Sequence, residues 1–262
     1  MFAGIDLGST NIKAAIYDEN MKLVDRQSVP VVYIRENGFV EFDAFKYCHA
    51  LVELLAIMVK ENQISSIRQI AFTGQAESLV VLGADGKPLM NAISWMDERS
   101  VEECKELEAK FDNRTCEEIT GQMAVLPTWP ATKILWLQKN RPAIYGAADT
   151  YMLLKDYVVY YLTGEKKSDM SIATFSFYFD IYNKCYWQEM LEAIGVSENQ
   201  LPQLCNAPLE DAVIRSQWEQ IITQQNQRIK AYGARQGVRL GTTAVAMLLT
   251  QNRYYILNVG DS

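Results

Sequence analysis

Near the start of the chain, residues suited to binding phosphate follow one another at short spacing. Gly8 can take backbone angles closed to other residues, which allows a sharp turn and a close approach to a ligand. Ser9 and Thr10 then offer backbone N–H groups and hydroxyls to phosphate oxygens. Asp6 is placed to hold a hydrated Mg²⁺, and Lys13 adds a cation nearby. The spacing predicts a turn that binds phosphate and Mg²⁺. The alternative is an ordinary hairpin with a capped turn, because so short a motif also occurs by chance.

Two apolar runs must position this turn. Residues 2–5 and 12–17 flank it directly, which predicts two adjacent strands joined by a tight turn. A third strand over 22–29 would complete a meander. Asp43 is expected to cap a helix whose apolar residues recur at helical spacing, and 67–73 is typical of a buried strand. Together these patterns indicate a mainly α/β protein.

A second group of polar residues is bracketed by apolar strands, and strand ends project side chains into clefts. A carboxylate or an amide there can bond sugar hydroxyls, and an indole can lie against a carbon chain. The residues that could line such a polyol pocket are Gln75, Glu77, Trp95, Asp97 and Arg99. The alternative is a surface hairpin with an ion pair between Asp97 and Arg99.

Composition and charge argue against several classes of protein. The 262 residues include 25 basic and 32 acidic side chains, and the net charge of −7 argues against nucleic acid or an anionic membrane as the main partner. No apolar run reaches the ~20 residues needed to span a bilayer, and the chain opens directly with a strand, so no secretory signal is expected. The five cysteines are scattered and odd in number, which favours reduced thiols in a cytoplasmic protein over a zinc site. His49, the only histidine, lies in a predicted helix, so a Ser-His-Asp hydrolase is not expected.

Beyond residue 100 the chain alternates helical and extended patterns, without an internal repeat or a low-complexity segment. Thr115 with Glu118 predicts a capping box for a short helix, and Pro127 with Pro130 suits the first turn of the next one. Further helices are predicted over 101–111, 154–162 and 187–194, and further strands over 149–153 and 175–181.

Several ordered motifs resemble those of the FGGY carbohydrate kinases, the family of xylulokinase, glycerol kinase and gluconate kinase. Each motif is weak singly, whereas their joint order and spacing are specific. The resemblance covers about residues 1–207. Its motifs are Gly4 to Thr10 with Lys13, Gly38 to Glu41, Thr73-Gly74-Gln75 before Glu77, Gly86-Lys87-Pro88, Trp95 to Arg99, Pro127 to Lys133, Asp156-Tyr157 with Leu162-Thr163-Gly164, and Asp169 with Ser171 and Ala173.

The resemblance implies an N-terminal domain over 1–207 with the ribonuclease-H-like fold of the actin–hexokinase ATPase superfamily. ATP with Mg²⁺ would donate a phosphoryl group to a hydroxyl of a sugar, polyol or sugar acid. Gly8, Ser9, Thr10 and Lys13 would bind the nucleotide phosphates, and Asp6 would act in catalysis by holding the metal.

The resemblance also assigns the substrate side. Gln75, Ala76 and Glu77 would meet substrate hydroxyls, and Trp95 would pack against the carbon skeleton. Thr128 stands where glycerol-type members present an aromatic residue to the substrate, which argues against glycerol. Xylulokinases usually have Met-His where this chain has Ala76-Glu77, so xylulose is not secured either.

Beyond residue 207 the chain departs from the family. Family kinases run to roughly twice this length, and their second domain carries the catalytic Asp, the adenosine pocket and the FGGY signature. None of these is recognisable here, and Asp6 does not replace the general base that the reaction needs. The chain is therefore expected to be a truncated kinase with little or no turnover.

The segment 208–262 is predicted to be a separate appendage, a helix over 216–232 followed by two strands about a turn at 251–253. Gly241-Thr242-Thr243 and Val259-Gly260-Asp261-Ser262 resemble part of the C-type metal-dependent Ser/Thr protein phosphatases, although the paired acidic motifs of that family are absent. A fused or rearranged reading frame is the simplest explanation. In the alternative, the segment is a divergent continuation of the kinase and Asp261 is its catalytic Asp.

Two functions of other classes stay open beside the kinase. One is a non-catalytic sugar-binding or interaction module, and the other is a protein phosphatase remnant. The expected partner is a small sugar or polyol, with neither nucleic acid nor a membrane involved, and a homodimer is left open.

Overall fold

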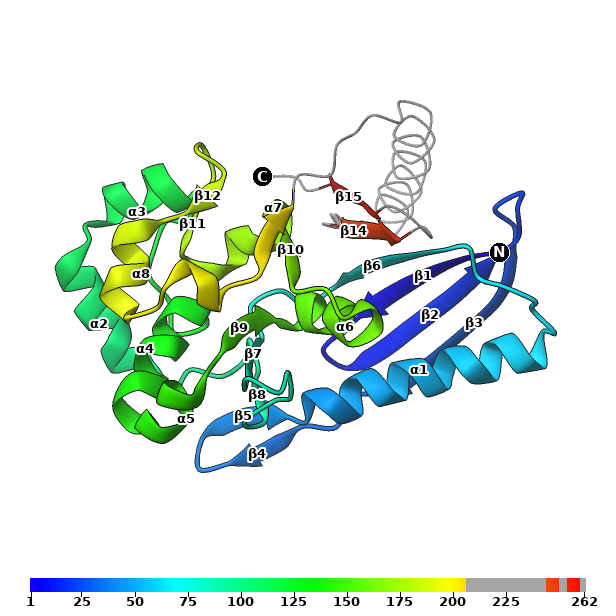
Figure 1. Ribbon diagram of the computed structural model, residues 1–262, viewed down its shortest axis with the longest axis horizontal. Helices are drawn as coiled ribbons and strands as arrows, with labels where there is room; N and C mark the ends of the chain where they lie inside the picture. The colour runs from blue at the N-terminus through cyan, green and yellow to red at the C-terminus, as the bar shows by residue number, and fades with distance from the viewer. Residues whose placement is uncertain (206–243, 250–253, 260–262) are drawn as a thin grey trace, which may run out of the picture.

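The computed structural model describes residues 1–205 and two strands at 244–249 and 254–259 (Figure 1). Within these residues, the larger sheets are a six-stranded one in the order β15-β14-β6-β1-β2-β3 and a five-stranded one in the order β4-β5-β8-β7-β9. Helices accompany both sheets, which confirms the predicted α/β class.

The N-terminal meander consists of three strands, and the first two alternate buried with more exposed side chains. β1 (Phe2–Leu7), β2 (Asn11–Tyr17) and β3 (Leu23–Pro30) pair antiparallel, and β6 (Gln69–Gly74) joins β1 in parallel. Successive side chains of a strand point to opposite faces, so every second residue of β1 and β2 enters the core. These core residues are Ala3, Ile5, Leu7, Ile12, Ala14 and Ile16. The predicted strands of the meander are confirmed.

Helix α1 (Ala44–Glu61) runs along this sheet and shares its hydrophobic core (Figure 1). It begins where the sequence predicts, because the Asp43 carboxylate accepts a hydrogen bond from the Lys46 backbone N–H at 2.9 Å. Its buried residues recur every three or four positions, as packing on one side of a helix requires. They include Tyr47, Cys48, Leu51, Leu54 and Met58.

The carboxyl ends of β1 and β6 lie unusually close together. In the parallel register Leu7 stands opposite Gly74, and the backbone N–H of Gln75 donates to the Leu7 carbonyl at 3.0 Å. A Cβ built on Gly74 would lie 2.5 Å from both the Cβ and the carbonyl oxygen of Leu7. Only glycine fits there, and its φ of +155° is one that other residues rarely adopt.

The five-stranded sheet draws its strands from residues 34–153, and most of the helices follow residue 100. Its strands are β4 (Ile34–Glu36), β5 (Phe39–Phe42), β7 (Leu79–Leu82), β8 (Ala92–Ile93) and β9 (Thr150–Leu153). The helices are α2 (Val101–Lys110), α3 (Asn113–Thr120), α4 (Pro130–Asn140), α5 (Pro142–Ala147), α6 (Leu154–Thr163), α7 (Met170–Ala173) and α8 (Gln188–Ile194). Short strands β10 (Lys167–Asp169) and β13 (Gln203–Cys205) pair in parallel, and β11 (Phe179–Asp180) pairs with β12 (Cys185–Tyr186).

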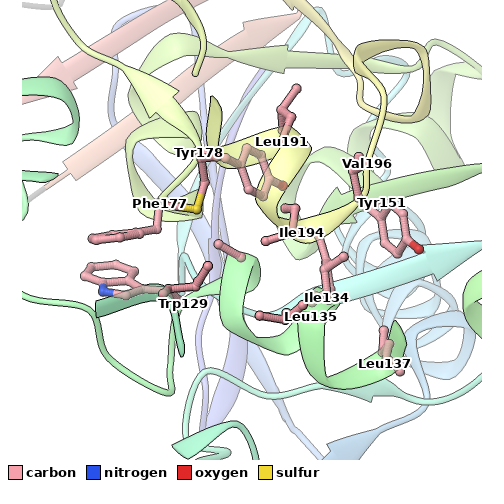
Figure 2. Packing of buried hydrophobic residues seen from close by; sticks show 14 of the residues in the cluster. Trp129, Ile134, Leu135, Leu137, Tyr151, Phe177, Tyr178, Leu191, Ile194 and Val196 are labelled. Carbon is pink, nitrogen blue, oxygen red and sulfur yellow. The ribbon is translucent and has the colours of Figure 1, made fainter. Parts of the chain in front are cut away.

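A second hydrophobic core holds α4 and α8 together (Figure 2). Ile134, Leu135 and Leu137 of α4 are fully or almost fully buried, as are Leu191 and Ile194 of α8. At one end of this core the rings of Trp129 and Phe177 stack with centroids 5.6 Å apart. This packing fixes the start of α4, and Thr128, one of the predicted substrate residues, lies just before that start.

Two predictions about local structure are wrong. The strand predicted over 175–181 is instead a 3₁₀ turn at Thr174–Ser176 followed by the two-residue strand β11, because Phe177 has a left-handed φ of +66° that breaks the extended chain. The cap of α3 is Asp112 rather than Thr115, since the Asp112 carboxylate accepts from the Thr115 N–H at 3.0 Å.

The two strands predicted near the end of the chain are confirmed. β14 (Ala244–Leu249) and β15 (Tyr254–Val259) pair antiparallel, with Leu249 opposite Tyr254. β14 also pairs antiparallel with β6, so the hairpin extends the six-stranded sheet. The predicted helix over 216–232 and the turn at 251–253 lie outside the described residues.

In the described part of the chain, none of the helices combines the length and the apolar character that crossing a bilayer would require.

We expect Gly74→Ala to lower the free energy of unfolding by about 2 kcal/mol, because the new methyl group would overlap Leu7 and push β6 away from β1. Gly4→Ala is the matched control. A Cβ on Gly4 has nothing within 4 Å, so this change should be neutral or slightly stabilising. Urea unfolding followed by circular dichroism measures both, and equal effects would contradict the close approach.

Candidate active site

The predicted phosphate turn is the short link between β1 and β2. A Cβ built on Gly8 would lie 2.5 Å from the Asn11 carbonyl oxygen, so the turn can close only with glycine at this position. Ser9 is half-buried and Thr10 is exposed, and the Thr10 carbonyl accepts a hydrogen bond from the Val31 N–H at 2.9 Å. The turn is therefore tight, anchored on one side, and open at the two residues predicted to meet phosphate.

Asp6 and Lys13 face each other across the β1–β2 pair. They are partners in the strand register, and the Lys13 Nζ lies 2.9 Å from the Asp6 Oδ2. Both side chains are partly exposed, so water screens the pair and the pair stabilises the fold little. Either group is free to turn toward a ligand at the adjacent turn.

Asp6 fits a metal that is held largely by other oxygens. Mg²⁺ in phosphate-binding sites takes one or two carboxylates, with phosphate oxygens and waters completing its shell. Within the described residues, no cluster of three or more His, Cys, Asp or Glu side chains could hold a metal by itself. Asp6, beside the Gly8 turn, suits a Mg²⁺ ion that is held by one carboxylate together with phosphate oxygens and waters.

Gln75 links the phosphate turn to the predicted substrate segments. Its side-chain amide donates to the Gly8 carbonyl at 3.4 Å, and the Tyr47 hydroxyl donates to the same oxygen at 3.2 Å. The Oε1 of Gln75 accepts from the Ser78 hydroxyl at 2.8 Å, and Ser78 in turn accepts from the Trp95 backbone N–H at 3.0 Å. One hydrogen-bonded path thus runs from the turn to Trp95.

Glu77 and Thr128 meet around a buried lysine. Both residues are half-buried, and the backbone carbonyl of each accepts a hydrogen bond from Lys133. Burial raises the pKa of the Glu77 carboxyl, while the Thr128 hydrogen bond and the Lys133 charge act against that rise. The Lys133 ammonium is fully buried and donates to the carbonyls of Thr128 at 2.6 Å, Ser94 at 2.9 Å and Glu77 at 3.4 Å. Ala76 lies in the same segment and is half-buried, with its carbonyl accepting from the Ser78 N–H.

The described geometry thus gathers Gly8, Gln75, Glu77, Trp95 and Thr128 into one connected set. The profile of the FGGY family of carbohydrate kinases, N-terminal domain, matches residues 1–228. The chain belongs to the FGGY family. The match runs past residue 207, where a boundary was predicted.

Comparison with related sequences agrees with the FGGY assignment. A xylulose kinase of Escherichia coli (strain K12) is 30% identical over 205 residues, which cover 78% of this chain and 42% of that protein. A glycerol kinase of Mycoplasmoides gallisepticum is 26% identical over 273 residues, which cover 98% of this chain and 53% of that protein.

The fold is also that of an FGGY kinase. The crystal structure of a gluconate kinase from Lactobacillus acidophilus matches with a TM-score of 0.73 at 25% identity, covering 79% of this chain and 42% of that one. The predicted ribonuclease-H-like fold of the actin–hexokinase superfamily is confirmed. The chain spans less than half the length of the curated xylulose kinases that it matches.

Asp97 and Arg99, which could have lined a polyol pocket in this FGGY chain, form a buried ion pair instead. Their side chains are 0% and 1% exposed, and the Arg99 Nε lies 2.7 Å from the Asp97 Oδ1. Arg99 also contacts Glu41 at 2.8 Å and lies over the Phe39 ring at 4.0 Å from its centroid. The predicted pair is confirmed, but it lies in the interior and not on a surface hairpin. The hydrogen bond from Arg99 is the chief influence that holds the pKa of Asp97 low against the effect of burial.

Sequence reasoning assigned no role to Lys133 or Ser78. Ser78 is fully buried and bridges Gln75 to the Trp95 backbone, and Lys133 joins three segments. A lysine within the apolar start of α4, followed directly by Ile134, was the one available signal. Asp261, the alternative catalytic residue, lies outside the described residues.

We expect Arg99→Met to lower the free energy of unfolding by about 3–5 kcal/mol, since it leaves the carboxylates of Asp97 and Glu41 buried without their cation. Arg114→Met is the matched control, because it breaks an exposed pair with Glu118 and should cost under about 1 kcal/mol. Urea unfolding of both variants is the measurement. A loss for Arg99→Met no larger than that of the control would contradict the buried network.

Proposed function

We propose that this chain forms the sugar-binding and phosphate-binding half of an ATP-dependent carbohydrate kinase. The observation that carries the proposal is the Gly8 carbonyl, which Gln75 and Tyr47 both contact. That contact ties the phosphate turn to the segment expected to hold the sugar. A kinase needs this arrangement, because it must bring the γ-phosphoryl group and the acceptor hydroxyl into line.

On the substrate side, each residue has a definite chemical role. Glu77 accepts hydrogen bonds from sugar hydroxyls, and Gln75 has an amide N–H and an oxygen lone pair left after its contacts within the fold. Trp95 is 38% exposed and offers an indole face to the carbon skeleton. Ala76 and Thr128 limit the size and set the polarity of the neighbouring wall.

On the phosphate side, Gly8, Ser9 and Thr10 present N–H groups and hydroxyls to the phosphate oxygens of ATP. Lys13 and Asp6 are paired in the absence of ligand. With ATP bound, Lys13 would instead bind a phosphate oxygen, and Asp6 would hold the hydrated metal. Mg²⁺ supplies neutralisation of the charge on the phosphate oxygens. Because the Asp6–Lys13 pair is exposed and weak, breaking it costs little free energy.

For the acceptor we propose a ketose, polyol or sugar acid, with xylulose the first to test because curated relatives are xylulose kinases. The general base that removes the proton from the acceptor hydroxyl is expected outside residues 1–207. We therefore expect this chain to bind sugar and to transfer phosphate poorly.

We further propose that the protein works in the cytoplasm, where ATP is available as the donor. All five cysteines lie within residues 1–205 and are free thiols there, and four of them are buried. Unpaired thiols suit a reducing compartment.

Saturable binding of one sugar from a panel of ketoses, polyols and sugar acids is expected in isothermal titration calorimetry of the full chain without ATP. Trp95→Ala should weaken that binding roughly tenfold, since the sugar would lose its apolar platform. Tyr182→Ala, which removes an exposed ring at the β11–β12 turn, is the control and should leave the affinity unchanged. The site assignment fails if both variants bind like the wild type.

ADP release from Mg²⁺-ATP with the same panel tests phosphoryl transfer. We expect release close to the sugar-free background, and the same from Asp6→Asn. Sugar-dependent release that disappears in Asp6→Asn would reveal a working kinase, would support the role of Asp6, and would contradict the expectation of poor transfer. Sugar binding without release is the outcome expected of this half of a kinase, and a non-catalytic sugar-binding module would give the same result.

A further inference from the structure

Three segments that are distant in sequence converge on the ammonium of Lys133. Glu77 follows β6, Ser94 follows β8, and Thr128 precedes α4. Within residues 1–205, the ammonium donates to one backbone carbonyl of each segment, at 3.4, 2.9 and 2.6 Å. A lysine ammonium has three N–H donors, so these contacts use its full capacity.

Each carbonyl belongs to a proposed substrate residue or to the residue beside one. Glu77 and Thr128 are themselves in the proposed sugar site, and Trp95 directly follows Ser94. A shift of any of these carbonyls therefore moves a side chain that is expected to meet the sugar. Lys133 itself is fully buried, so it touches the backbone of the site and not its ligand.

We propose that Lys133 is a positioning residue, whose ammonium sets the mutual placement of the Glu77, Trp95 and Thr128 segments. The effect on sugar affinity rests on the proposed function. The effect on the three segments does not, because it follows from contacts within the fold.

The charges around Lys133 fit this role. Glu77, Asp97 and Arg99 face it from the two loops that follow β6 and β8. Burial lowers the pKa of Lys133 to about 7. The carboxylates of Glu77 and Asp97 oppose this lowering, because they favour the charged ammonium. Methionine has nearly the same length but no donor. It would remove one hydrogen bond from each of the three carbonyls and leave Glu77 without its nearby cation, although the Ser94 carbonyl would keep its bond from the Asp97 N–H at 3.1 Å.

A merely structural lysine supplies the control. Lys155 in α6 is equally buried and ion-pairs with Asp169 and, at 2.6 Å, with Asp156. Lys155→Met removes the same charge from an interior site, but none of the three substrate segments bonds to the Lys155 ammonium in the described structure. A comparison of Lys133→Met with Lys155→Met separates positioning from general loss of stability.

Hydrogen–deuterium exchange of the full chain, read by mass spectrometry, needs no ligand. We expect Lys133→Met to speed exchange in peptides covering 75–79, 94–98 and 124–129 together, while Lys155→Met leaves these three peptides as in the wild type. Faster exchange around Thr128 alone, or equal changes in both variants, would overturn the proposal.

Sugar affinity gives the second readout. Lys133→Met should weaken binding about tenfold, the equivalent of one or two misplaced hydrogen bonds, and Lys155→Met should bind as the wild type does. Unchanged affinity in Lys133→Met would overturn its part in the sugar site. If the wild type itself binds no sugar, the proposed function fails, and the exchange experiment still decides whether Lys133 organises the three segments.

Either methionine variant could fail to fold, because each leaves buried polar groups unpaired. Lys133→Gln and Lys155→Gln then carry the same comparison, since a shorter uncharged amide keeps some donor capacity in both interiors. Glutamine at 133 cannot reach all three carbonyls, so at least one of the three peptides should still exchange faster. Protection of all three at the wild-type level would overturn the proposal.

Discussion

The parallel pairing of β1 with β6 is the constraint on which the rest of the site depends. Parallel strands end at the same edge of a sheet, and the register that sets Leu7 opposite Gly74 makes the two chain reversals after them neighbours. One reversal is the Gly8 turn and the other begins the Gln75 segment. Because Gly74 has no side chain, the Gln75 N–H reaches the Leu7 carbonyl, and the Gln75 amide reaches Gly8. Backbone geometry thus makes the proposed phosphate site and the proposed sugar site neighbours.

Charge divides the site into a rigid part and an adaptable part. Under the sugar segments the charged groups are buried and bonded: Arg99 lies between Asp97 and Glu41, and Lys133 lies among three carbonyls. Removing one partner from such a buried group is strongly destabilising, so the surrounding backbone is held in one arrangement. Asp6 and Lys13 form the opposite case, an exposed pair that costs little to break. This difference suits the proposed reaction, in which the acceptor side would stay rigid while a charged nucleotide arrives and leaves.

Much of the fold could be predicted from the sequence because local signals and tertiary packing agree there. Such local signals act over only a few residues. Examples are the alternating apolar residues of β1 and β2, the Asp43 cap of α1 and Gly164, which ends α6. On the substrate side, predictions failed where a distant partner decides the outcome. Asp97 and Arg99 have the composition of a surface turn, and only Glu41 and Phe39 from another strand make them an interior network. The position of Lys133 in the apolar start of α4 did not reveal its partners, since the carbonyls that it binds come from segments up to 56 residues away. Hydrogen bonds to backbone carbonyls are independent of residue type, so no sequence motif announces them.

The hairpin β14–β15 is part of the six-stranded sheet, in which it pairs with β6. β6 pairs with β1 along one side, which leaves the N–H and C=O groups of its other side in need of partners. β14 pairs along that side, with Met247 opposite Phe72 and Leu249 opposite Ile70. The two strands β14 and β15 thus extend a sheet whose other strands belong to the FGGY domain. The sheet therefore continues across the boundary that was predicted after residue 207. Since β6 leads directly into Gln75, the hairpin that covers its edge also supports the strand on which the proposed sugar site begins.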